Sequence, residues 1–194
     1  MASTDMPDTI YHTHENILDL IPTVQNEEFS ISVEPAKSLK SFSLFRHGCN
    51  EKYISFVIMG VLKGLEYIHV RENLVHGNIN LDNVFVDNDC KVKLESPMRK
   101  NCQVDQEQKT DIQMVGELAL SLSTKKSGIK FFLGYMRKKK KTGLVENLVK
   151  FCLNPSRTPT LREVINHEFF KEFGEFDRYQ EKLKKRLQKK LCKI

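Results

Sequence analysis

The first 36 residues contain no lysine or arginine, although the chain of 194 residues carries a net charge of +6. A secretory signal peptide needs a basic region before an apolar run, and the N-terminal stretch MASTDMPDTI has neither. The longest apolar run, from Ile54 to Leu62, is far shorter than the ~20 residues that a membrane span requires. The sequence therefore predicts a cytoplasmic protein without a transmembrane segment, with the nucleus as an alternative location.

Cysteines are few, and no two of them lie at the spacing of a metal-binding or redox motif. The chain has five, and no two form a C-x-x-C motif. This argues against a disulfide framework and against a zinc site. His12 and His14 have no cysteine or carboxylate partner at ligand spacing, so we expect ordinary side chains there.

Positive charge is concentrated in two stretches. Residues 125–141 carry eight positive and no negative charges, and residues 171–194 carry nine positive and four negative charges. The remainder of the chain is acidic. Basic patches at 125–141 and 178–193 can contact nucleic acid or an anionic membrane, although solvated loops and faces have the same composition.

Two strand pairs are expected from alternating apolar residues. In residues 17–39, Phe29, Ile31 and Val33 alternate with polar residues after a turn at Gln25-Asn26-Glu27, which is the period of a half-buried strand. A second hairpin is predicted at residues 84–94, around the turn Asp-Asn-Asp.

Helical periodicity accounts for most of the rest. The helix at residues 53–71 is the clearest, and Thr110 or Asp111 is the expected N-cap of a second. Thr160 is the expected N-cap of a helix at 160–170. The other predicted helices cover residues 143–153 and the basic amphipathic tail 176–194, whose apolar stripe comprises Phe176, Tyr179, Leu183, Leu187 and Leu191. The order predicts an α+β fold with a larger helical part.

These segments, taken in order, resemble a eukaryotic protein kinase. HENILDLI is similar to the family's fourth strand, FSISVEPAKSL to the fifth strand and hinge, and GVLKGLEYIH to the helix before the catalytic loop. LVHGNINLDNVFV is similar to the catalytic-loop pattern H-R-D-L-x-x-x-x-N. TDIQMVG and LNPSRTPTLREVINHEFF resemble later helices of the larger lobe. The resemblance implies a mostly helical C-lobe with a remnant of the N-lobe sheet.

The chemistry that the resemblance implies is missing at each position. Asn78 stands where the family has its catalytic aspartate, and an amide cannot take a proton from a hydroxyl. Gly77 replaces the loop arginine, and Asn80 replaces the lysine of serine/threonine kinases. Ser96 stands where a carboxylate should bind magnesium, which leaves Asn83 as the only retained metal ligand.

Other kinase parts have no counterpart in this sequence. A glycine-rich loop, the phosphate-holding lysine and an A-P-E motif are absent. Glu34 and Ala36 are the hinge candidates, but we expect neither ATP nor magnesium to bind. His76 and Asp111 are expected to brace the loop backbone, and Asn83 to hydrogen-bond it without a metal. The short activation segment resembles the pseudokinase region of ribonuclease L, and GVLKGLEYIH is equally similar to sterile-twenty-like pseudokinases.

The sequence thus predicts a remnant of the N-lobe at 1–37, a C-lobe at 38–170 and a basic helix at 171–194. The expected function is that of an inactive pseudokinase, acting as a scaffold or allosteric partner of another protein. The alternative is a serine/threonine kinase-like protein with residual ATP binding or phosphotransfer, if a longer N-terminus exists. The tail stripe either packs on the domain or binds a partner.

Overall fold

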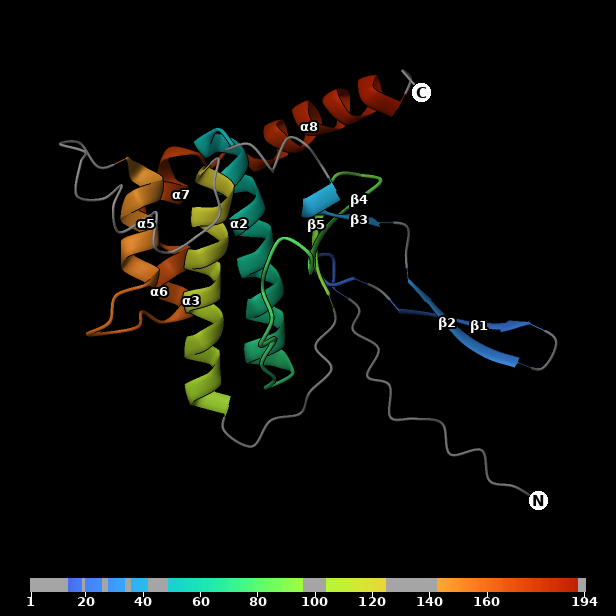
Figure 1. Cartoon of the computed structure of the whole chain (residues 1–194), viewed down its shortest axis with the longest axis horizontal. Helices are drawn as coiled ribbons and strands as arrows, with labels where there is room; N and C mark the ends of the chain where they lie inside the picture. The colour runs from blue at the N-terminus through green and yellow to red at the C-terminus, as the bar shows by residue number, and fades with distance from the viewer. Residues whose placement is uncertain are drawn as a thin grey trace.

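The computed structural model describes residues 14–18, 20–25, 28–33, 36–41, 49–95, 104–124 and 143–191. Helices gather on one side of the molecule, and short strands extend from the other (Figure 1). The strands are β1 Leu20–Gln25, β2 Glu28–Val33, β3 Ala36–Ser38, β4 Val84–Asp87 and β5 Val92–Leu94. The helices are α2 Glu51–Glu66, α3 Val104–Ser123, α5 Leu144–Cys152, α6 Leu161–Ile165, α7 Glu168–Glu172 and α8 Phe176–Leu191. The predicted α+β class is confirmed.

Helix α2 is the centre of the core. Asn50 caps its first turn by accepting a hydrogen bond from the Lys52 backbone N–H at 3.0 Å. The helix contacts α3, α5, α6, α7, α8 and β5, and it continues into a π-helical turn, η2, at Tyr67–Arg71. The predicted helix at 53–71 is therefore confirmed, with its last turn wound more widely than an α-helix.

The segment Glu51–Arg71 is long and apolar enough to cross a membrane by length and composition, with a mean hydropathy of 1.3. However, 67% of its apolar window is buried inside the protein. Among the described residues no other segment meets that criterion. The apolar surface of this helix is already used by the core, which explains its composition without a bilayer.

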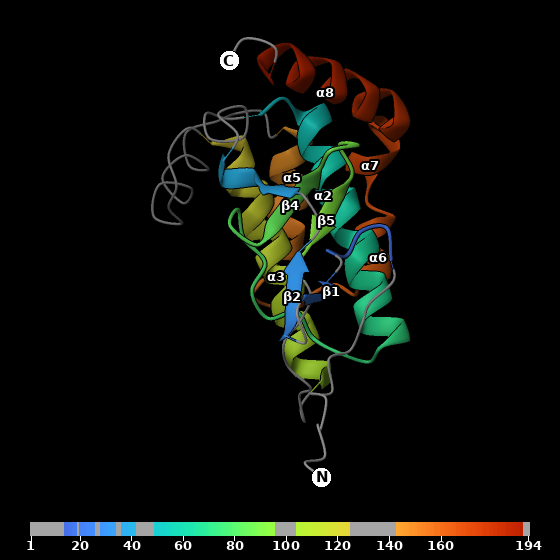
Figure 2. The same cartoon turned by 90° about the vertical axis from the view of Figure 1, so that its right-hand side faces the viewer.

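Strands form two small antiparallel sheets. β1 pairs with β2, as the alternating pattern predicts, and β3, β4 and β5 form the second sheet in that order. The segment 14–18 adds to the free side of β5, where the Leu94 N–H donates to the Asn16 carbonyl at 2.8 Å. Figure 2 shows β4 and β5 lying in front of α2, so this sheet connects the N-terminal segment to the helical core.

Two glycines of α2 allow β5 and the N-terminal segment to approach closely. A Cβ added to Gly60 would lie 2.6 Å from the Val92 Cβ, and one added to Gly64 would lie 2.8 Å from the Asn16 carbonyl oxygen. Real Cβ atoms essentially never come so near another heavy atom. Glycine is therefore required at both positions by packing against α2.

The expected start of α3 is wrong. The helix begins at Val104, so Thr110 and Asp111 lie inside it and cap nothing there. Residues 104–110 lack an apolar period, but Gln, Glu and Lys are good helix formers and extend the helix toward its N-terminus. The Asp111 side chain is thereby free to serve another segment.

The predicted helix at 160–170 starts as expected but is divided into α6 and α7. Thr160 and Glu163 form a reciprocal capping box. Asn166 ends α6, and His167 then starts α7 by accepting a hydrogen bond from the Phe169 N–H at 3.2 Å. The break turns Phe169, which is fully buried, toward the core.

Candidate functional site

The loop from His76 to Asn83 lies between η2 and β4, at the position of the predicted catalytic loop. Gly77 has a φ of 73°, in the left-handed region that L side chains rarely adopt. Glycine at this position therefore permits the turn. The loop's conformation is that of a tight, hydrogen-bonded bend rather than an extended connection.

Asp111 holds this loop from beneath. Its Oδ2 accepts from the His76 N–H at 2.9 Å, and its Oδ1 accepts from the Gly77 N–H at 2.7 Å. His69 Nε2 lies 2.8 Å from the same Oδ2. The carboxylate is fully buried, and these donors offset the cost of removing it from water. The expected bracing role of Asp111 is confirmed.

The ring of His76 links the loop to the end of β5. The Asn78 N–H donates to His76 Nδ1 at 3.2 Å, so Nδ1 is an acceptor and the ring proton is on Nε2. Nε2 then donates to the Glu95 carbonyl at 3.0 Å. Burial lowers the pKa of His76 below its ordinary value, although the negative charge of Asp111 acts in the opposite direction. A neutral ring fits both hydrogen bonds.

Three asparagine side chains form a chain of hydrogen bonds in the loop. The Asn80 Nδ2 donates to the Asn78 Oδ1 at 2.8 Å, and the Asn83 Nδ2 donates to the Asn78 carbonyl at 3.0 Å. The Asn80 Oδ1 in turn accepts from the Asp82 N–H at 2.8 Å. The predicted hydrogen bond from Asn83 to the loop backbone is present in this geometry.

Two further contacts fix the loop on the core. Ile79 is buried, and its N–H lies 3.4 Å from the sulfur of Met114 on α3. On the other side, the Lys40 N–H donates to the Leu81 carbonyl at 3.0 Å. The loop is thus held to α3 and to the turn after β3.

Two carboxylates near the loop are already engaged. Asp111 is buried beneath the loop with both oxygens occupied, and Asp82 pairs with Lys40 at 2.9 Å on the surface. At the position of the base stands Asn78, an exposed amide. Amides orient hydroxyl groups by donating and accepting hydrogen bonds, but they do not accept a proton at neutral pH.

Some predicted positions fall outside the described residues. These are the hinge candidate Glu34, the degenerate metal position Ser96 and the basic patch 125–141. Ala36, the other hinge candidate, lies in β3 and pairs with Asp87 of β4. The backbone of Ala36 is thus paired in a sheet, and among the described residues no contact joins Ala36 to Asn78.

Sequence reasoning missed His69 and Met114. His69 lies in η2, 42 residues from its partner Asp111, and Met114 lies on α3, 35 residues from Ile79. Both appear in the sequence as ordinary members of helices. No local signal marks them, because their roles depend on the packing of α2 against α3.

Comparisons with known proteins agree with part of this interpretation. No protein-family model matches the chain. An inactive leucine-rich repeat receptor-like serine/threonine-protein kinase from Arabidopsis thaliana is 38% identical over 86 residues, which is 39% of this chain and 14% of the relative. The mitogen-activated protein kinase pmk-1 of Caenorhabditis elegans is 27% identical over 89 residues, which is 42% of this chain and 23% of the relative. The chain spans less than a quarter of either relative, and the part that it shares with them is kinase-like in sequence.

Proposed function

We propose that this chain is a catalytically inactive protein kinase-like domain, a pseudokinase, that acts by binding another protein as a scaffold or allosteric partner. The observation that carries the proposal is the chain of hydrogen bonds formed by Asn78, Asn80 and Asn83. It occupies the place where phosphoryl transfer needs a base and a metal ligand.

A network of neutral amides supplies neither the base nor the charged metal ligand that phosphoryl transfer needs. Transfer needs a group that takes the hydroxyl proton, and Asn78 has none. The Asn78 oxygen that could face a substrate already accepts a hydrogen bond from Asn80. Magnesium prefers charged oxygen ligands, and the retained ligand position holds a neutral amide, Asn83, whose Nδ2 donates to the Asn78 carbonyl. ATP and magnesium are therefore not expected as cofactors.

The frame of the site supports a role in binding. Asp111, His69 and His76 hold the loop through buried hydrogen bonds that need no nucleotide. A loop whose shape is fixed in this way presents the same surface with or without ATP. One relative that shares part of this sequence carries the word inactive in its name, which agrees with this reading of the loop.

The catalytic half of the proposal is tested by phosphotransfer assays with generic protein substrates. The wild type, Asn78→Ala and Asn78→Asp are compared with an active kinase, and a thermal-shift titration with Mg-ATP is run on each. We expect all three to stay at background, because one restored carboxylate supplies neither the phosphate-holding lysine nor the magnesium-binding carboxylate that Ser96 replaces. Magnesium-dependent turnover by the wild type above Asn78→Ala would overturn the proposal.

The binding half is tested by affinity purification of the wild type and Asn78→Ala from cells. A partner that recognises the fixed shape is retained by both proteins and is not released by Mg-ATP. A partner that Mg-ATP elutes from the wild type would indicate a working nucleotide site instead.

A further inference from the structure

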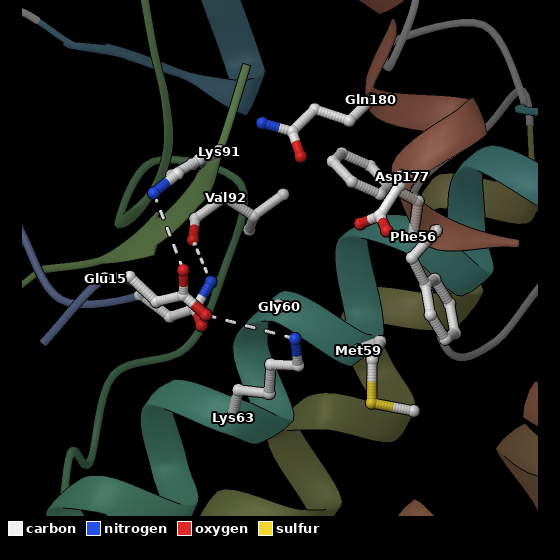
Figure 3. Close-up of a pocket in the computed structure, with 11 residues that line it drawn as sticks. Glu15, Phe56, Met59, Gly60, Lys63, Lys91, Val92, Asp177 and Gln180 are labelled. Atoms are coloured by element: carbon white, nitrogen blue, oxygen red, sulfur yellow. Dashed lines mark hydrogen bonds and ion pairs between the residues drawn. The ribbon is translucent and has the colours of Figure 1, made fainter. Parts of the chain in front are cut away.

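Helix α2 and the π-helical turn η2 that follows it border two hollows on the surface. The first is a cavity between α2, β5 and the start of α8, beside Asp177 (Figure 3). There Lys63 lies 4.0 Å from Glu15 Oε1, and Lys91 lies 3.5 Å from Glu15 Oε2. The Glu15 carboxylate already serves both ammonium groups, so the positive charges of this cavity are matched within the protein.

The second hollow is a groove between η2 and α6, near the C-terminal end of the same helix. None of its lining residues belongs to the cavity of Figure 3 or to the loop at 76–83. The groove is therefore a separate surface of the helical part. Its lining residues are Glu66, Val70, Leu161, Arg162, Ile165 and Asn166.

The centre of this groove is apolar and open to solvent. Val70 is 71% exposed, and no other large apolar side chain is exposed among the residues that the structure describes. Leu161 and Ile165 of α6 line the same groove and are partly buried against the core. A single exposed apolar side chain is common on protein surfaces, but here three apolar side chains surround one groove. The groove can therefore take an apolar side chain from another segment.

Charged side chains stand on the two sides of the apolar centre. Glu66 is the last residue of α2, Arg162 lies on α6, and both side chains are exposed. In the part of the chain that the structure describes, neither side chain forms a hydrogen bond or an ion pair. A segment that occupies the groove thus meets a carboxylate on the η2 side and a guanidinium group on the α6 side.

The described part of the N-terminal segment begins at the edge of this groove. The ring of His14 stacks on Tyr67 at a centroid separation of 4.8 Å and an interplanar angle of 19°, and Tyr67 directly follows Glu66. An extended chain advances about 3.3 Å per residue, so Asp8 can lie up to about 20 Å from His14. A helix with its side chains is about 10–12 Å across. Residues 8–13 are therefore long enough to pass from Tyr67 across the groove to α6.

The sequence of residues 8–13, which lie outside the described residues, has a period of two. Residues two apart share a face of an extended chain, so Asp8, Ile10 and His12 share the face of His14. From His14 outward, that face carries an imidazole, an aliphatic side chain and a carboxylate. From the η2 side to the α6 side, the groove carries a carboxylate, an apolar centre and a guanidinium group. Each group of the segment is thus matched in order by its complement.

We propose that residues 8–12 of this chain bind in the groove between η2 and α6 as an extended segment. The side chain of Ile10 fills the apolar centre, and the carboxylate of Asp8 pairs with Arg162. His12 lies beside the carboxylate on the η2 side. Because the stack of His14 on Tyr67 holds the segment a few residues away, its effective concentration at the groove exceeds that of a second copy in solution.

This inference does not depend on the proposed lack of kinase activity. Docking covers Val70 and joins the N-terminal segment to the helical part. A partner protein that uses the same groove must first displace residues 8–12, so the segment regulates access to this surface.

The test is photo-cross-linking within the whole chain. A photoactivatable leucine analogue replaces Ile10 in one protein and Thr9, which lies on the other face of the segment, in a second protein. Mass spectrometry maps the products, and mixing isotope-labelled with unlabelled chains distinguishes cross-links within one copy from those between copies. We expect the probe at position 10 to label Val70 and residues 161–166 of its own copy, and the probe at position 9 to label them far less. Equal labelling from both positions, labelling of another part of the chain, or cross-links between copies would overturn the proposal.

Variants of the protein with the probe at position 10 test each contact. Val70→Ser is expected to lower the cross-linked fraction at least about threefold by removing apolar surface. Lys150→Gln, exposed on α5, is the control and should leave the cross-linked fraction unchanged. Urea unfolding confirms that the substituted proteins remain folded. A cross-linked fraction that Val70→Ser leaves unchanged would overturn the proposal.

The charged contact has a matched control within the segment itself. Asp8→Asn and Arg162→Gln are each expected to lower the cross-linked fraction about twofold to fivefold, the range of an exposed ion pair. Asp5→Asn removes the same charge from the other face and should have no effect. An equal effect of Asp5→Asn and Asp8→Asn would mean that net charge, rather than a pair with Arg162, attracts the segment, and it would overturn the assigned register.

Discussion

The carboxylate of Asp111 on α3 lies 2.8 Å from the Nε2 atom of His69 on η2, and both side chains are buried. The same carboxylate accepts hydrogen bonds from two backbone N–H groups of the loop at 76–83. One side chain therefore connects the central helix, α3 and the candidate site. Loss of the negative charge of Asp111 should therefore weaken the contacts among all three.

Asp111→Asn is expected to destabilise the protein by about 2–3 kcal/mol. The asparagine NH₂ group is a donor, so at least one of the N–H groups that now donate to the Asp111 carboxylate loses its acceptor. A buried polar group without a partner costs about that much. Urea unfolding measures the change. Glu117→Gln, on an exposed position of the same helix, serves as the control and should stay within about 0.5 kcal/mol of the wild type. Equal stability of the two variants would contradict the bracing role.

Local signals in the sequence predicted several elements correctly. The apolar period of α2, the alternation of β4 and β5, and the N-cap Thr160 each depend on residues within one segment. The kinase-like motifs also predicted that Asp111 supports the loop. The first three features needed no knowledge of how distant segments pack, whereas the contact of Asp111 with the loop was expected only from the resemblance.

One error is local, and the omissions concern long-range packing. The N-cap expected at Thr110 or Asp111 was placed where the apolar period begins, but helix propensity carries α3 back to Val104. His69 could not be identified, because its partner lies on another helix. The cavity beside Asp177 likewise exists only because α8 returns to α2 and β5. A single sequence carries no signal for such contacts.

Stability is expected to decrease as the pH falls below about 6.5. Burial lowers the pKa of His76, and it also lowers the pKa of His14 and His167. The unfolded chain therefore takes up protons on these histidines at a higher pH than the folded chain. Between the folded and unfolded pKa values of each histidine, the unfolded state binds more protons than the folded state. The free energy of unfolding therefore decreases as the pH is lowered through this range, and it is restored in full above the pKa of the unfolded histidine.

His76→Gln tests the share of that effect that belongs to the loop. The glutamine amide can donate and accept as the neutral ring does, but it does not titrate. Urea unfolding at a series of pH values between 5 and 8 should show a shallower slope for His76→Gln than for the wild type, with the remainder due to His14 and His167. An unchanged slope would mean that His76 has the same pKa in the folded and unfolded states.

Gly60→Ala is expected to destabilise the protein by about 1–3 kcal/mol, the cost of overpacking a core. The new methyl group would lie 2.6 Å from the Val92 Cβ, so α2 and β5 must separate. Gly174→Ala is the control, because its Cβ would lie 3.5 Å from the nearest heavy atom, the Phe170 carbonyl oxygen. Thermal unfolding of both variants measures the difference. A Gly60→Ala protein as stable as the wild type would show that β5 yields easily.

The docking of α8 should depend on one aromatic side chain rather than on its charges. Tyr179 is 6% exposed and belongs to the core, whereas the Lys184–Asp89 pair lies at the surface, where Asp89 is 71% exposed. Tyr179→Ala removes a buried ring and is expected to cost about 3 kcal/mol. Asp89→Asn should have little effect on stability, since exposed ion pairs contribute little.

Unfolding of the two variants, together with hydrogen exchange in α8, separates these contributions. Faster exchange across α8 in Tyr179→Ala, with near-normal exchange in Asp89→Asn, is the expected result. The opposite order would mean that the basic face of α8 holds it against the β4–β5 turn. Its apolar stripe would then be available for a partner, which is the alternative that the sequence left open.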